Sequence, residues 1–383
     1  MTHVIVGGGL AGGLVALALA QAGRGRGLTL VEQGQRLGGN HTWSFHETDL
    51  DAEGSALLAP LLCRQWPGQR VRFPGRERIF VSGYASVTSD RFADLLAARL
   101  EQAGARVVLG RRVAAVEARA VHLDDGTALR ASVVLDARGP EAAPPARRLG
   151  FQKFLGLELE LGADGPWADP VLMDATVPQR DGYRFVYVLP FSPRRVLIED
   201  TIYSGNARLD AFELERRILA YAAEHGAHVT RVLRRETGVL ALPLGEAAAE
   251  PNDPRQEAPI AVGYRGGFFH PVTGYSLPLA ARVAVAVAKA RTAAETREAV
   301  RGLFRELAPQ RRFGHLLNRL MFDAMPPAAR WTALDRFYRL PEPTIARFYA
   351  SRSTLLDRAR ILLGRPPAGL SWKHLWRPRA EMA

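Results

Sequence analysis

The chain has 383 residues, 47% of them hydrophobic, which is enough for two or three domains with cores of their own and excludes a disordered tail or linker. Its single cysteine excludes an internal disulfide and a metal site built from several cysteines, and the spacing of the histidines predicts no metal site. The formal net charge is +12, and residues 311–383 carry 14 Arg or Lys against 5 Asp or Glu, a surplus of 9, so the basicity belongs to the C-terminal fifth.

The first 32 residues predict a dinucleotide-binding unit. A short apolar strand, "VIV", runs into the turn Gly7-x-Gly9-x-x-Gly12, and an apolar helix follows over 14–22. A second strand ends at Glu32, twenty residues after Gly12, where a carboxylate can accept hydrogen bonds from an adenosine ribose. The glycines permit a tight turn, and the N-terminus of the helix offers free N–H groups to a pyrophosphate.

No export signal and no membrane span are predicted. The chain enters its first strand and glycine turn at once, which leaves no room for an apolar signal segment and a cleavage site. The longest apolar run, "GGLVALALAQAG", is shorter than the ~20 residues of a membrane-spanning helix. With one cysteine, this pattern indicates a cytoplasmic protein.

Residues 34–139 favour FAD over NAD. A second glycine pair ends at Gly39, with Asn40 after it, as in flavoproteins whose FAD passes under such a pair. One helix is predicted over 89–104, followed by short strands, a hairpin and an apolar strand that ends at Asp136. This order is typical of a glutathione-reductase-like FAD domain as found in flavin hydroxylases.

A third flavin segment is predicted after residue 259. It has a strand over 260–262, Gly263, and Pro271 eight residues later, but Tyr264 stands where flavin hydroxylases usually have aspartate. The spacing predicts a helix beginning near residue 274, whose N-terminus would stabilise negative charge on the pyrimidine edge of a reduced flavin. The residues at that N-terminus are Thr273, Gly274 and Tyr275.

Two adjacent acids interrupt an apolar strand, "RRVLIEDTIY", over 194–203. Because strand side chains alternate between faces, Glu199 and Asp200 point to opposite sides and have different roles. One interpretation is an edge strand with charges that prevent aggregation, or an acid paired with an arginine. The other is a catalytic acid.

The same sheet is expected to contain strands over 152–161 and 182–191, with a helix over 207–226 packed on it. Tyr183, Phe185 and Tyr187 alternate on one strand and form a wall for a long apolar substrate.

The C-terminal residues 358–379 mix cations with Trp372 and Trp376. This composition is typical of a surface that meets anionic lipid headgroups. Two alternatives stay open: nucleic acid as the partner of the basic segment, and an ordinary solvated arginine-rich helix pair.

Four stretches, "GGNHTWSFH", "IEDTIYSGNARLD", "GGFFHPVTGYSLPLA" and "FYRLPEPTIARFYASRSTLLDRARILLGRPP", together resemble the bacterial lycopene β-cyclases, and the resemblance covers nearly the whole chain. It implies an FAD enzyme, an isomerase, that folds the two acyclic ends of lycopene into β-ionone rings through γ-carotene to β-carotene. It also implies that Glu199 is the catalytic acid and base, that other acyclic carotenoids are substrates, and that the chain lies on the inner face of the cell membrane near other carotenoid enzymes.

The chemistry fits these residue types. Cyclisation adds a proton to one double bond and releases a proton from another carbon, so no electrons are transferred overall. A protonated carboxyl in an apolar pocket supplies the first proton. Aromatic faces and reduced FAD, with NADPH as the expected reductant, stabilise the cation. The candidate catalytic residues are Glu199, Asp200 and His270; the candidate cofactor residues are Gly7, Gly9, Gly12, Glu32, Gly39, Asn40, Asp136, Gly263, Pro271, Thr273, Gly274 and Tyr275; the candidate substrate residues are Trp43, Phe45, Tyr183, Phe185, Phe268 and Phe269.

The expected fold is α/β (α+β): a glutathione-reductase-like, FAD-binding Rossmann domain with a mixed-sheet substrate domain and a helical C-terminal region. The FAD domain is assigned to 1–70, 86–150 and 255–300, the substrate domain to 71–85 and 151–254, and the helical region to 301–383. The rival functions are an FAD-dependent monooxygenase acting on a hydrophobic substrate, a non-catalytic flavoprotein that docks on membranes, and a nucleic-acid-binding protein.

Overall fold

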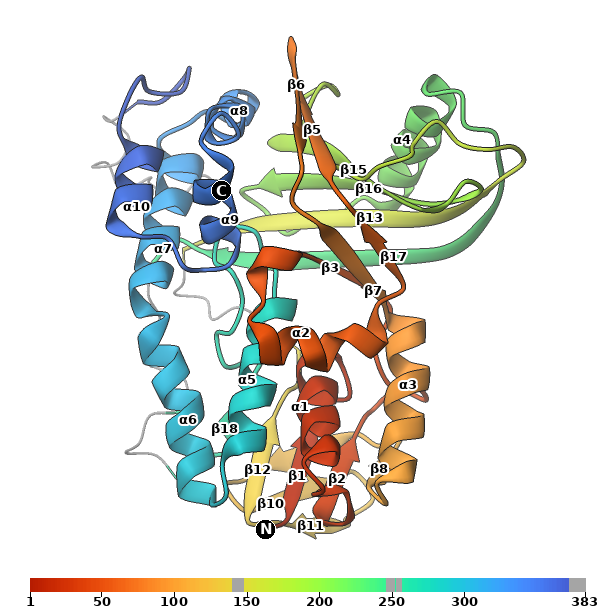
Figure 1. Cartoon of the computed structure of the whole chain (residues 1–383), viewed down its shortest axis with the longest axis vertical. Helices are drawn as coiled ribbons and strands as arrows, with labels where there is room; N and C mark the ends of the chain where they lie inside the picture. The colour runs from red at the N-terminus through yellow and green to blue at the C-terminus, as the bar shows by residue number, and fades with distance from the viewer. Residues whose placement is uncertain (140–147, 246–251, 253–256, 372–383) are drawn as a thin grey trace.

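A five-stranded parallel sheet forms the lower half of the molecule in Figure 1. The computed structural model describes residues 1–139, 148–245, 252 and 257–371. The strands lie in the order β18 (Ile260–Ala261), β12 (Val133–Asp136), β1 (His3–Val6), β2 (Leu28–Val31) and β8 (Arg106–Val108). Every neighbouring pair is parallel, so the carboxyl ends of the strands meet at one edge, where such sheets bind ligands.

Opposite faces of β1 carry different neighbours because its side chains alternate. Ile5 packs in the core formed with the helices α1 (Leu10–Gln21), α3 (Ser89–Gln102) and α5 (Leu277–Lys289). Val4 and Val6 pack against the small antiparallel sheet of β9 (Val113–Val116), β10 (Ala120–Leu123) and β11 (Ala128–Arg130). The expected turn between β10 and β11 is present, with Gly126 at φ +84°.

A seven-stranded mixed sheet forms the upper half (Figure 1). Its order is β17 (Val229–Pro243), β13 (Leu149–Leu161), β16 (Arg195–Ser204), β15 (Tyr183–Ser192), β14 (Val171–Asp174), β5 (Gln69–Phe73) and β6 (Arg76–Phe80). The strand with the two acids, β16, is therefore internal, so the interpretation of it as an edge strand is wrong. One edge is β17, a fifteen-residue strand that was not predicted; exposed residues such as Arg231, Leu233 and Arg235 alternate in it with less exposed ones, as is typical of an edge strand.

The two faces of this sheet are covered differently. Helix α4 (Ala211–Glu224) packs on one face around Leu157, Val188 and Ile198. The other face looks onto the C-terminal helices, which follow one another along the left side of Figure 1. These are α7 (Ala308–Asp323), α8 (Trp331–Phe337), α9 (Glu342–Tyr349) and α10 (Leu355–Leu362), whereas α6 (Ala293–Glu306) packs in the core around α1 and α5.

A three-stranded sheet, β3 (Thr42–His46), β7 (Tyr84–Thr88) and β4 (Arg64–Trp66), lies with α2 (Ala52–Leu58) between the two large sheets (Figure 1). The α/β prediction with a mixed second sheet and a helical C-terminal region is confirmed. The segment 372–383, with both predicted membrane-facing tryptophans, lies outside the described residues.

Candidate active site

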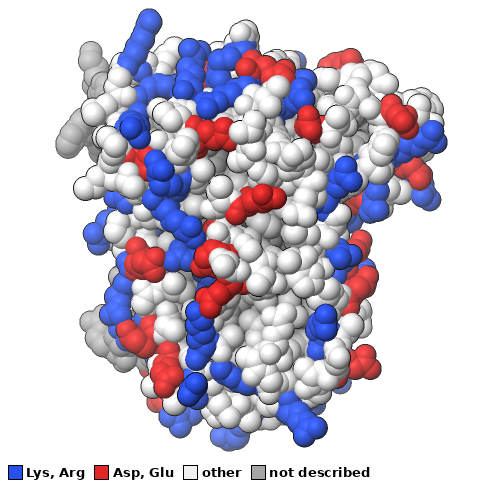
Figure 2. Space-filling model, viewed as in Figure 1, with Lys and Arg blue, Asp and Glu red and all other residues white. Residues whose placement is uncertain are grey.

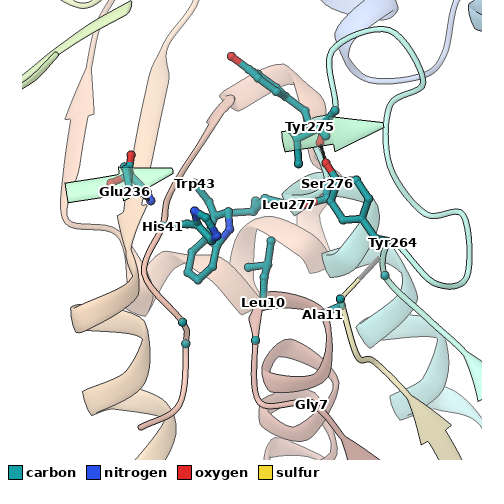
Figure 3. A pocket seen from close by; sticks show the side chains of 18 of the residues that line it. Gly7, Leu10, Ala11, His41, Trp43, Glu236, Tyr264, Tyr275, Ser276 and Leu277 are labelled. Atoms are coloured by element: carbon teal, nitrogen blue, oxygen red, sulfur yellow. Dashed lines mark hydrogen bonds between the residues drawn. The ribbon is translucent and has the colours of Figure 1, made fainter. Parts of the chain in front are cut away.

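A cavity of about 800 Å³ lies between the two large sheets. Its lower end is the carboxyl edge of the parallel sheet, and its upper end is the inner face of the seven-stranded sheet, closed by residues of the C-terminal helical region. Figure 3 shows the lining at close range: His41, Trp43 and Glu236 lie on one side, and Tyr264, Tyr275 and Ser276 on the other. The cavity therefore joins the predicted dinucleotide site to the predicted substrate sheet.

The glycine turn after β1 forms the floor of the cavity. Gly7 has φ +102°, and a Cβ on Gly12 would lie 2.0 Å from the carbonyl oxygen of Gly7, so only glycine allows this turn to close against α1. A Cβ on Gly9 or on Gly39 would meet no atom within 4 Å, and both residues line the cavity. Backbone N–H groups at the start of α1 are thus open to an anionic ligand.

Glu32 lies at the end of β2 and lines the same part of the cavity. Its Oε2 accepts a hydrogen bond from the Gly8 N–H (2.7 Å), and its Oε1 accepts one from the Gly34 N–H (2.8 Å). These bonds fix the carboxylate beside the glycine turn. The residues present therefore fit the ribose and pyrophosphate of a dinucleotide.

Positive charge lines this end of the cavity. Arg138 and Arg265 both line it and both contact the buried carboxylate of Asp136, at 2.7 Å and 3.4 Å. Asp136 does not itself line the cavity; it fixes the two guanidinium groups that do. Asn40, also predicted to contact the cofactor, instead donates from Nδ2 to the Arg235 carbonyl (2.6 Å) and so ties the segment before β3 to β17.

The third predicted flavin segment reaches the cavity, but its helix begins later than predicted. Gly263, at φ +60°, approaches the start of α1, where a Cβ would lie 2.7 Å from that of Ala11. Helix α5 starts at Leu277 and not near residue 274, because residues 270–275 form a tight turn in which the Gly274 N–H bonds to the His270 carbonyl (2.9 Å). Thr273, Gly274 and Tyr275 line the cavity as part of that turn. Pro271 does not line it.

His270 stabilises this turn from inside. Its Nδ1 accepts from the Thr273 N–H (3.3 Å), its Nε2 donates to the Phe348 carbonyl (3.0 Å), and burial lowers its pKa to about 4. Because His270 is buried and does not line the cavity, the structure gives it no access to a substrate there.

The upper part of the cavity is lined by aromatic rings. Trp43, Phe185 and Tyr187, which were expected to contact the substrate, line it, and so do Phe154, Tyr203, Tyr264, Tyr275, Tyr338 and Tyr349. The Tyr84 hydroxyl bonds to those of Tyr187 (2.9 Å) and Tyr275 (3.4 Å), which holds these two rings in place. Tyr349 and Tyr338 are outside the predicted set; they lay in a motif quoted for the family resemblance, without a role assigned.

Four predicted substrate residues lie outside the cavity lining. Phe45 is buried in the core around α1, and Phe268 packs edge-on against Phe304 in the same core. Phe269 stacks on the ring of Tyr264 at 4.6 Å, and Tyr183 stacks on Phe185 at 5.3 Å. The last two therefore support rings that do line the cavity.

The two adjacent acids of β16 lie on opposite faces. Glu199 lines the cavity and is paired with Tyr187 on the neighbouring strand β15. Its Oε1 accepts a hydrogen bond from the Thr201 hydroxyl (2.5 Å). Burial, and then the negative charge of Glu236, raise the pKa of Glu199 to about 8. Near neutral pH this carboxyl therefore holds a proton.

Asp200 lies under α4 with no exposed surface and does not line the cavity. Arg184 of β15 holds it in a forked ion pair, with Nε 2.9 Å from Oδ1 and Nη2 2.7 Å from Oδ2. Asp200, predicted to be catalytic alongside Glu199, is thus separated from the cavity by the sheet itself. The arginine-paired interpretation describes Asp200, and the acid that faces the cavity is Glu199.

The match to known proteins covers most of the chain. A family model described as "Lycopene cyclase protein" matches residues 3–374. The chain is 45% identical over 368 residues to a lycopene beta-cyclase of Pantoea ananas, covering 95% of this chain and 94% of that protein. It is 43% identical to one from a Paracoccus strain, covering 97% and 96%.

The fold is shared more widely. A geranylgeranyl bacteriochlorophyll reductase-like protein of Thermoplasma acidophilum superposes with a TM-score of 0.60 at 16% identity, covering 94% of this chain and 95% of that one. Identity this low shows a common fold alone.

Proposed function

The chain belongs to the lycopene cyclase family, and on this premise we propose that it is a lycopene β-cyclase that folds the acyclic ends of lycopene into β-ionone rings. The observation that carries the proposal is the position of Glu199, a carboxyl that keeps its proton near neutral pH and faces an aromatic cavity continuous with a dinucleotide site. An FAD-dependent monooxygenase is not favoured, because relatives of this chain at 43–45% identity over at least 95% of its length are lycopene β-cyclases.

We propose that FAD occupies the lower part of the cavity. Gly7, Gly9, Glu32 and Gly39 would hold its adenosine and pyrophosphate, and residues 273–275 would meet the ring system. Bound and reduced by a donor such as NADPH, the flavin would supply negative charge, which stabilises a cation in a dry site.

Glu199 begins the reaction by donating its proton to C2 of the C1–C2 double bond of an acyclic end. The electron pair of the C5–C6 double bond then forms the C1–C6 bond, and the proton lost from C6 restores a C5–C6 double bond. The Glu199 carboxylate accepts that proton, so the enzyme returns to its starting state and the product is an isomer of the substrate. No oxidant is consumed.

The aromatic walls stabilise the intermediate cation without trapping it. Each ring face contributes about 0.5 to 2 kcal/mol toward a nearby cation. Burial raises the pKa of Tyr275 to about 12 and those of Tyr187 and Tyr203 well above their usual value, so these phenols stay neutral. A neutral hydroxyl engaged with another tyrosine, as in Tyr187, is a poor nucleophile toward the cation.

Peripheral attachment to a membrane is proposed because the substrate dissolves in lipid and not in water. No helix among the described residues is long and apolar enough to span a bilayer. At α10 the side chains of Leu355, Leu356 and Leu363 are 81%, 58% and 70% exposed, with Arg358 and Arg360 beside them. Figure 2 shows Lys and Arg side chains gathered toward the upper left, where Figure 1 has α8 and α10. Exposed leucines among arginines suit an anionic lipid surface.

Expression in a cell that accumulates lycopene tests the proposal, with the pigments separated by chromatography. We expect lycopene to be replaced by γ-carotene and β-carotene. Unchanged lycopene in cells that contain the folded, flavin-loaded protein would contradict the cyclase, and an oxygenated product would support the monooxygenase. A second assay in detergent compares oxidised with reduced flavin in the absence of oxygen; full activity with oxidised flavin would contradict the role of the reduced form.

A further inference from the structure

Two carboxyl side chains lie in one row of the seven-stranded sheet, with a glycine between them. Gly156 of β13 pairs with Glu199 of β16 on one side and with Glu236 of β17 on the other. Residues paired directly across a sheet point to the same face, and both glutamates line the cavity. A Cβ on Gly156 would lie 2.9 Å from the Cγ of Glu236 and 3.2 Å from its Oε1, so the absent side chain leaves room for Glu236 between the strands.

Glu236 has the hydrogen-bond partners of an ionised carboxylate. Its Oε2 accepts from the Thr42 N–H (2.8 Å) and from Nη1 of Arg234 (2.7 Å), and only 2% of the residue is exposed. Arg234 is itself fixed, because its Nε donates to Glu158 (3.0 Å) and its Nη2 to the Thr42 hydroxyl (2.6 Å). Burial raises the pKa of Glu236 above its usual value, and the Arg234 guanidinium and the Thr42 N–H oppose that rise because they stabilise the charged form.

Glu199 has a different environment. Its carboxyl accepts a hydrogen bond from the Thr201 hydroxyl, and no arginine or lysine within the described residues forms an ion pair with it. A second negative charge in this row would face that of Glu236 across the side-chain-free position of Gly156, in a cavity that screens charge poorly.

We propose that Glu236 is a positioning residue, which keeps a proton on Glu199 by placing a fixed negative charge in the same row of the sheet. This inference rests on the proposed role of Glu199 as proton donor and deepens it. The two acids then divide the work: Glu236 stays ionised and paired with Arg234, and Glu199 exchanges the proton.

The other groups that face Glu199 do not replace this charge. From β15, the turn before α5 and β16 itself come Tyr187, Tyr275 and Tyr203, which are neutral because burial raises their pKa values. Asp200 acts from the opposite face of the sheet and contributes less than Glu236 to raising the pKa of Glu199. His41, beside Arg234, has a pKa lowered by burial and is neutral as well.

The test is the pH profile of lycopene conversion by the flavin-loaded Glu236→Gln variant. We expect wild-type activity to fall as pH rises through about 8, the pKa of Glu199. Without the neighbouring charge Glu199 loses its proton more easily, so we expect this alkaline fall to move to lower pH by about one unit. Glu236→Asp, which restores the charge, is expected to move the profile back toward wild type.

Glu215→Gln is the matched control. Glu215 is a carboxylate paired with Arg235, the neighbour of Glu236 on β17, but it lies outside the cavity lining. Its variant is expected to keep the wild-type profile. If Glu236→Gln folds with an unchanged melting temperature and its alkaline fall stays at the wild-type pH, the inference is wrong.

A measurement independent of activity separates this inference from the proposed function. Infrared titration of the holoenzyme follows the carbonyl band of the protonated carboxylic acid that disappears in Glu199→Gln. We expect this band to titrate at lower pH in Glu236→Gln and in Gly156→Ala, whose added methyl group pushes Glu236 away. If the band titrates at the same pH in wild type, Glu236→Gln and Gly156→Ala, the inference is wrong even if the enzyme is a cyclase. If the titration moves in a protein that does not convert lycopene, only the proposed function is contradicted.

Discussion

Glu199 and Asp200 are consecutive residues whose carboxyl groups lie on opposite sides of the seven-stranded sheet: one lines the aromatic cavity, and the other is buried under α4 in a forked pair with Arg184. Chemically similar side chains one position apart therefore have separable functions. Replacing each by its amide distinguishes chemistry from stability.

Glu199→Gln removes the proton donor and keeps the shape of the side chain. Loss of a general acid lowers rates by roughly 10² to 10⁴, so we expect lycopene to persist in cells that express this variant. The fold and the flavin content should be unchanged, because the carboxyl forms no ion pair with any residue that the structure describes. Pigment chromatography together with the flavin absorbance of the purified protein measures both, and β-carotene at wild-type yield would contradict the role of Glu199.

Asp200→Asn acts on stability. The change leaves the Arg184 guanidinium buried without its carboxylate, and breaking a buried ion pair costs about 3 to 5 kcal/mol of the free energy of unfolding. We expect a lower melting temperature and less soluble protein, but a rate per folded, flavin-loaded molecule within a few-fold of wild type. A stable variant with no activity would instead place Asp200 in the chemistry.

The pH dependence of stability should report the protonated Glu199. Its pKa is raised from 4.5 to about 8 on folding, so the folded chain binds a proton that the unfolded chain has released over this interval. The stability from this proton is fully present below pH 4.5 and is lost as pH rises through about 8. Glu199→Gln has no such loss. We expect its free energy of unfolding to equal that of wild type at pH 5 and to exceed it at pH 8 by about 2 kcal/mol. This value is reduced for solvent screening because the carboxyl faces the cavity. Urea titrations at the two pH values measure the difference, and equal stability at pH 8 would mean that Glu199 is ionised.

Gly12→Ala should abolish flavin binding. Its Cβ would collide with the Gly7 carbonyl oxygen at 2.0 Å and open the turn that forms the floor of the cavity. The control is Gly302→Ala in α6, where a Cβ meets nothing within 4 Å and the helix gains about 0.5 to 1 kcal/mol. We expect loss of the flavin spectrum in the first variant and a slightly raised melting temperature in the second. Full flavin content in Gly12→Ala would contradict the cofactor site.

Leu355→Asp combined with Leu363→Asp should weaken binding to anionic liposomes, because both leucines are largely exposed beside arginines at α10. Phe212→Asp is the control: Phe212 is 82% exposed but lies on α4, at the opposite upper corner of Figure 1. Flotation on vesicles that contain phosphatidylglycerol measures the effect. Equal flotation of both variants and wild type would show that α10 does not contact the membrane.

Local patterns predicted much of the site. The spacing of Gly7, Gly9 and Gly12, with Glu32 after the second strand, depends on neighbouring residues alone, and all four lie at the carboxyl edge of the parallel sheet. Alternation along β16 likewise separated Glu199 from Asp200. These features follow from φ and ψ preferences and from the two-residue period of a strand.

Features that depend on long-range pairing were not predicted. Glu236 lies near Glu199 only because of the register in which β13 pairs with β16 and β17. No local pattern in a charged edge strand predicts that register. Tyr349 reaches the cavity from α9 through the packing of the C-terminal helices. Phe268 and Phe269 were assigned to the substrate because their motif was expected next to the flavin, but in the fold Phe268 lies in the core around α1 and Phe269 stacks behind Tyr264.

The order in which the ribosome releases the chain gives the C-terminal helices a further importance. Gly7 and Leu10 at one end of the cavity are synthesised more than 300 residues before Tyr338 and Tyr349 at the other end. Until then the aromatic face of the seven-stranded sheet is open to water, and Glu199 is an ordinary solvated acid. A chain truncated before α9 is therefore expected to expose an apolar surface to chaperones and proteases and to have no partial activity.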